Sequence, residues 1–74
     1  MKYEEFRASV LEAVRECPKA WRKGQAVFNI VEDRYGVARA VQFEDGIDCF
    51  HCDSHIEHFL QAAWKRITKY RTEP

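Results

Sequence analysis

An apolar side chain recurs at every third or fourth position in the last third of the chain. The positions are Ile56, Phe59, Leu60, Ala63, Trp64 and Ile67. All six fall on one face of an α-helix, because a helix turns once in about 3.6 residues. Ser54, followed three residues later by Glu57, has the pattern of a capping box. We therefore predict a helix from residue 54 or 55 to about Tyr70.

The first part of the chain shows the same helical spacing. Its apolar positions are Phe6, Val10, Ala13, Val14 and Cys17. Pro18 has no backbone N–H and disfavours helical angles at the residue before it, so a helix cannot continue through it. The pattern predicts a helix from Tyr3 to about Glu16, with Cys17 as a small buried hydrophobic residue.

A third apolar stripe follows the corner at Pro18. It consists of Trp21, Val27, Phe28, Val31 and Tyr35. Gly36 then supplies a left-handed helix end. We predict a helix from Ala20 or Trp21 to Tyr35. Gly24 costs about 1 kcal/mol relative to alanine inside a helix, which favours a start nearer Lys23.

Residues 37–43 fit two patterns. The positions that alternate as in a strand are Val37, Arg39, Val41 and Phe43. The positions that fit a helical face are Val37, Ala40 and Val41. A turn signal, Glu44-Asp45-Gly46, follows and would allow a β-hairpin at about 37–50. Periodicity alone leaves both structures open.

The composition of the 74 residues indicates one small globular domain, residues 1–74. A chain of this size removes only about 60% of its unfolded surface from water. Hydrophobic residues make up 46% and aromatic residues 14%, which supports a core without a compulsory disulfide or metal. The charged N-terminus does not resemble a signal peptide, and no apolar run approaches a membrane span. We expect a cytoplasmic protein with free thiols and no membrane partner.

Two of the three cysteines and all three histidines lie between residues 49 and 58. Cys49 and Cys52 form a C-x-x-C pair, and His55 and His58 continue the same spacing. Thiolates and imidazoles are the ligands that zinc prefers in a tetrahedral site. One hypothesis is therefore a zinc site at these four residues. The alternative is structural, with Cys49 and Phe50 pointing into the core and the histidines in solvent.

The same segment contains residues that can order a loop before the last helix. These structural loop residues are Asp48, Phe50, Asp53 and Ser54. Asp48 is expected to accept backbone hydrogen bonds in the turn. Asp53 is expected to cap the last helix in competition with Ser54.

Basic residues gather near the start of the second predicted helix and near the end of the last. The candidate phosphate contacts are Arg22, Lys23, Lys65, Arg66 and Lys69. Such residues can bind a nucleic-acid backbone. Cations in the last turn of a helix also complement its dipole, and the twelve basic residues are balanced by twelve acidic ones. Nucleic-acid binding is therefore an alternative function.

Two segments, residues 22–29 (RKGQAVFN) and residues 47–56 (IDCFHCDSHI) with Phe59 beyond, resemble a group of short uncharacterised proteins from phages, mobile elements and gut bacteria. That group carries R-x-G-Q-x-x-F-N and then D-x-F-x-x-D followed by an apolar residue and phenylalanine. The resemblance covers roughly half of the chain and brings no activity with it.

The resemblance implies a compact, mainly helical domain in which Gly24 and Gln25 open a helix and Asp48, Phe50 and Asp53 shape the loop before the last one. It therefore favours a short helix over a strand for residues 37–43. The group usually has tyrosine, aspartate and a basic residue where this chain has His51, Cys52 and His55. A zinc site would thus be particular to this chain.

These patterns predict a mainly α domain of three to four helices; the alternative is an α+β domain with the hairpin. The expected core consists of Phe6, Val10, Val14, Trp21, Val27, Phe28, Val31, Phe59, Leu60, Ala63, Trp64 and Ile67. Because no complete catalytic set is visible, we expect no enzyme. The aromatic content predicts an exposed apolar patch, and hence a protein-interaction module that binds another protein or itself. A nucleic-acid-binding domain and a zinc-binding module are the alternatives.

Overall fold

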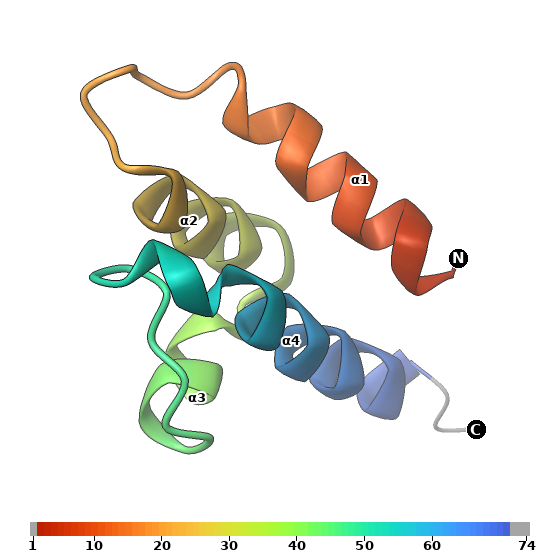
Figure 1. Ribbon diagram of the computed structural model, residues 1–74. Helices are drawn as coiled ribbons and strands as arrows, with labels where there is room; N and C mark the ends of the chain where they lie inside the picture. The colour runs from red at the N-terminus through yellow and green to blue at the C-terminus, as the bar shows by residue number, and fades with distance from the viewer. Residues whose placement is uncertain (1, 72–74) are drawn as a thin grey trace.

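The computed structural model describes residues 2–71, which form four α-helices (Figure 1). These are α1 (Tyr3–Val14), α2 (Lys23–Tyr35), α3 (Ala38–Phe43) and α4 (Ile56–Arg71), and one short 3-10 helix, η1 (Asp53–His55), leads into α4. Residues 37–43, which periodicity left open, contain α3, and no strand occurs among residues 2–71. The prediction of a mainly helical domain is confirmed, and the hairpin is not needed.

Two glycines determine the ends of α2. The helix begins at Lys23, directly before Gly24, rather than at Ala20 or Trp21. At its other end Gly36 has a φ of 69°, in the left-handed region that residues with a Cβ atom disfavour. The Gly36 N–H donates to the carbonyl oxygens of residues 31 and 32, at 3.2 and 2.9 Å. The helix therefore ends with a left-handed cap, as the sequence indicated.

The C-terminal end of α1 is tighter than an α-helix. The N–H groups of Glu16 and Cys17 donate to carbonyl oxygens three residues back, each at 3.1 Å, which is the 3-10 pattern. α1 therefore ends at Val14, before the predicted end at Glu16. Cys17, expected to be buried, is only partly buried, and its sulfur lies 3.6 Å from the Ala13 carbonyl oxygen.

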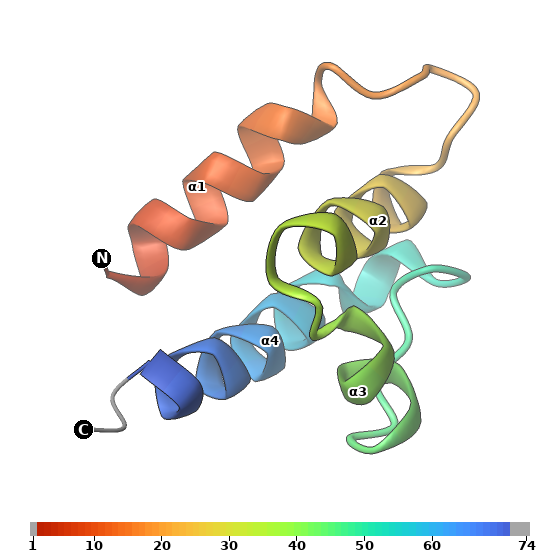
Figure 2. The same cartoon turned by 180° about the vertical axis from the view of Figure 1, so that it is seen from behind.

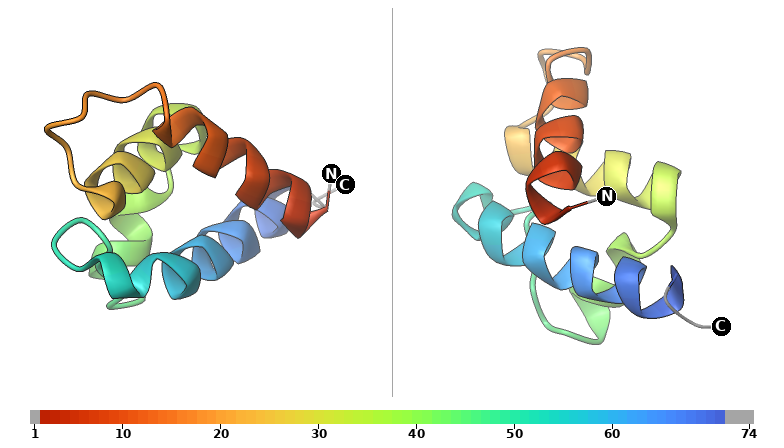
Figure 3. Two further views of the ribbon diagram at one scale, coloured as in Figure 1. Left: turned by 45° about the horizontal axis from the view of Figure 1, so that its top comes forward. Right: turned by 90° about the vertical axis from the view of Figure 1, so that its right-hand side faces the viewer.

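α2 contacts each of the other three α-helices. α1 and α4 converge where the start of α1 meets the C-terminal half of α4, and they diverge toward the other end, where α2 lies between them (Figure 3, left). Tyr3 and Phe6 meet Trp64 at the converging end, with ring centroids 6.3 and 5.2 Å apart. α3 and the loop of residues 44–52 lie beside each other at the opposite end, on the outside of the molecule (Figure 2).

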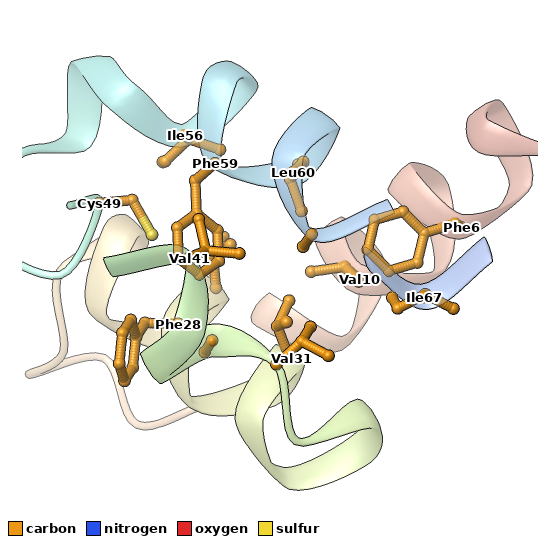
Figure 4. Close-up of a cluster of buried hydrophobic side chains, with 14 residues drawn as sticks. Phe6, Val10, Phe28, Val31, Val41, Cys49, Ile56, Phe59, Leu60 and Ile67 are labelled. Carbon is orange, nitrogen blue, oxygen red and sulfur yellow. The ribbon is translucent and has the colours of Figure 1, made fainter. Parts of the chain in front are cut away.

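All four helices contribute to one hydrophobic core (Figure 4). Its most deeply buried members are Phe6, Val10, Ala26, Val27, Val31, Ala38, Val41, Cys49, Phe59, Leu60 and Ala63. Ala38 and Val41 of α3 were not among the expected core residues, whereas Cys49 of the loop is buried, as the structural alternative to a zinc site predicted. Trp21 was expected in the core but is 37% exposed, because it precedes the first residue of α2 instead of lying on the buried face of that helix. Val14 and Trp64 are partly buried against the core.

Candidate interaction surface

The loop of residues 44–52 is held against the start of α2 at Gly24. The Gly24 N–H donates a hydrogen bond to Asp53 Oδ1 at 3.0 Å, and the Cys49 thiol donates one to the Gly24 carbonyl oxygen at 3.3 Å. A Cβ atom at position 24 would lie 1.9 Å from the Cys49 carbonyl oxygen. Only glycine therefore allows the loop to approach the helix this closely.

Asp53 caps α2 and not the helix that follows it. Gly24 is the second residue of α2, and its N–H is one of the donors that a helix start leaves without an intrahelical partner. The sequence predicted a cap on the last helix from Asp53 or Ser54, with Glu57 completing a capping box. In the structure Glu57 instead forms an ion pair with Arg7 of α1. The first turn after Asp53 is correspondingly the 3-10 helix η1.

The two segments that carry the family resemblance contact each other. The Arg22 guanidinium donates to the Phe50 carbonyl oxygen at 3.0 Å, beside the contacts of Gly24 described above. The Phe28 and Phe50 rings pack edge to face, with centroids 5.4 Å apart. Residues 22–28 and 48–53 thus form one structural unit that joins the start of α2 to the loop.

Asp48 organises the loop itself. Its Oδ1 accepts hydrogen bonds from the N–H groups of Phe50 and His51, at 2.9 and 3.4 Å, and from the Gln42 side-chain amide at 3.1 Å. Its Oδ2 lies 2.9 Å from His51 Nδ1. Partial burial opposes ionisation of this carboxyl group, but the hydrogen bonds from His51, Phe50 and Gln42 outweigh it and lower the pKa of Asp48. The ionised carboxylate therefore orders the loop at neutral pH.

A surface hollow of about 370 Å³ lies between α3 and this loop. The residues that line it are Phe28, Arg39, Gln42, Phe43, Phe50 and His51. Phe28 is buried, Phe50 is partly buried and Phe43 is 78% exposed, so aromatic side chains extend from the core to the solvent. We call this feature the aromatic hollow.

Polar contacts hold the chain on both sides of Phe43. Near the start of α3, the Arg39 N–H donates to Glu32 Oε1 at 3.2 Å. After its end, the Arg66 guanidinium of α4 donates to the two carboxylate oxygens of Asp45 at 3.0 and 2.9 Å. These hydrogen bonds from Arg66 lower the pKa of the Asp45 carboxyl group. Phe43 is therefore presented to solvent by a helix that is fixed at both ends.

Sequence reasoning gave Phe43 no functional role. The signal that could have found it is its spacing from Arg39, because residues four apart share one face of a helix. Ala38 and Val41 occupy the buried face of α3, whereas Arg39 and Phe43 are both exposed. If residues 37–43 form a helix, Phe43 lies on the same face as the charged Arg39, and that face is expected to be in solvent.

Trp21 is the other large hydrophobic side chain that is exposed among residues 2–69, whose side chains the structure describes. It lines a hollow of about 350 Å³ with Asn29, Ile30 and Asp33. This hollow contains no second aromatic ring from the described residues, in contrast to the aromatic hollow.

The structure does not bring the four predicted zinc ligands together. Burial raises the pKa of the Cys49 thiol to about 12, and this thiol donates its hydrogen bond to the Gly24 carbonyl oxygen. The Cys52 sulfur lies 3.0 Å from the Ser54 hydroxyl oxygen. His55 and His58 both line a hollow of about 290 Å³. In the described part of the chain, no three histidine, cysteine, aspartate or glutamate residues are grouped so that they could hold a metal ion.

The predicted phosphate contacts form two separate groups. Arg22 and Lys23 lie at the start of α2, next to η1, whereas Lys65, Arg66 and Lys69 lie in the second half of α4. At the helical rise per residue, Lys65 is about 15 Å along α4 from η1. Arg22 and Arg66 already make the contacts described above. The basic residues therefore do not form one continuous surface.

None of the helices in residues 2–71 is both long enough and apolar enough to cross a membrane. Comparison of the chain with protein-family models, with curated proteins and with solved structures gave no match. The aromatic hollow, with Phe43 at its edge, is accordingly the candidate functional site on the grounds of its geometry.

Proposed function

We propose that this chain is a small, non-enzymatic, cytosolic interaction module that binds another protein or a copy of itself at the aromatic hollow. The observation that carries this proposal is the 78% exposure of Phe43 beside Phe28 and Phe50. Single exposed apolar side chains are ordinary on protein surfaces, but a contiguous apolar patch is typical of a binding site. Phe43 lines one hollow together with Phe28 and Phe50, so its ring adjoins other aromatic side chains.

The surroundings of Phe43 support the proposal in two ways. An aromatic anchor held in place before binding loses little conformational entropy, and the Arg66 contacts with Asp45 hold the end of α3. The exposed Arg39 guanidinium lines the same hollow and forms no ion pair with residues 2–69. Aromatic residues and arginine are the side chains that most often dominate binding energy at protein interfaces.

The lining of the hollow also favours binding over catalysis. His51 is oriented by Asp48, as a general base is in many enzymes. However, the lining residues include no serine, cysteine, threonine or lysine beside it that could act as a nucleophile. An apolar hollow with an arginine at its edge is suited to an apolar side chain of a partner with an acidic neighbour.

The proposal is tested by selecting binders from a phage-displayed library of random peptides on immobilised protein. Phe43→Ser removes the exposed ring at the hollow, and Trp21→Ser is the matched control, because it removes the other exposed aromatic ring. We expect the wild type and Trp21→Ser to enrich the same peptides and Phe43→Ser to lose them. Circular dichroism verifies that both variants fold. Equal enrichment on Phe43→Ser would contradict the proposed function, and so would a wild type that enriches no peptide and also stays monomeric at millimolar concentration.

A further inference from the structure

We draw no further inference here: the strongest candidate, the aromatic hollow between α3 and the loop of residues 44–52, carries nothing beyond the proposed function, because nothing in the structure shows what covers it.

Discussion

At the scale of single residues, Gly24 is where one added methyl group has the largest consequence. Helix propensity alone would favour alanine by about 1 kcal/mol. The added carbon would instead meet the Cys49 carbonyl oxygen at 1.9 Å, which forces the loop away from α2. We expect Gly24→Ala to lower the free energy of unfolding by about 1 to 3 kcal/mol, the usual cost of overpacking. Urea denaturation followed by circular dichroism measures this change.

The neighbouring position provides the control for that experiment. Gln25→Ala changes a partly buried side chain on the same turn of α2 and should shift the free energy of unfolding by no more than about 0.5 kcal/mol. If Gly24→Ala were as stable as the wild type, or more stable, the close contact between the loop and α2 would be contradicted.

The role of Gly24 also shows what residue-level reasoning can and cannot reach. The sequence identified the glycine as costly inside a helix, and this placed the start of α2 correctly near Lys23. It did not show that the glycine accommodates a carbonyl group 25 positions later, because a contact between distant segments leaves no local periodicity. The exposure of Trp21 was missed for a related reason: a stripe of apolar residues extended beyond the true start of the helix.

At the scale of elements, α2 takes its cap from a carboxylate 29 positions later in the chain. Asp53→Ala should therefore lower the free energy of unfolding by about 1 kcal/mol, the typical value of a helix cap. Ser54→Ala should change it by less than about 0.5 kcal/mol, because its hydroxyl group caps no helix. Thermal and urea denaturation of the two variants side by side measure the difference. If Ser54→Ala lowered the free energy of unfolding more than Asp53→Ala, this would support the capping box that the sequence suggested for the last helix.

The helices themselves were predictable, because their apolar spacing, Pro18 and Gly36 are local signals. Residues 37–43 were ambiguous by spacing, and the choice of a helix came from the family resemblance. The aromatic hollow was not predictable, since it forms only where α3 meets the loop of residues 44–52. The segment before α4 looked like a capping box, and the pairing of Glu57 with Arg7 replaced it through a contact between α4 and α1.

At the scale of the whole molecule, ion pairs of acidic side chains connect different helices. Glu57 pairs with Arg7 and joins α4 to α1, and Asp45 pairs with Arg66 and joins the end of α3 to α4. The hydrogen bonds from these arginines lower the pKa of both carboxyl groups in the folded chain. As the pH falls, the unfolded chain therefore binds protons at a higher pH than the folded chain does. The two ion pairs contribute to stability above the pKa values that these carboxyl groups have in the unfolded chain, about 4. This contribution is lost as the pH decreases through the lower pKa values of the folded chain.

We accordingly expect the free energy of unfolding to decrease below about pH 4, as measured by urea denaturation at a series of pH values. Asp45→Asn should make this decrease shallower, because it removes one of the carboxyl groups with a lowered pKa. Glu12→Gln is a suitable control, since Glu12 forms no ion pair with a residue in the described range, and it should keep the wild-type slope. An equal slope for Asp45→Asn and the wild type would contradict this account.

The cap that Asp53 provides for α2 also has a consequence for the order of folding. The start of α2 acquires its cap only after the chain between residues 24 and 53 has closed, so the entropy of that closure must be lost first. The first turn of α2 and the loop therefore form and open together as one cooperative unit. Because the same loop supplies Phe50 and His51 to the aromatic hollow, a ligand in the hollow would slow the fraying of α2 from a distance.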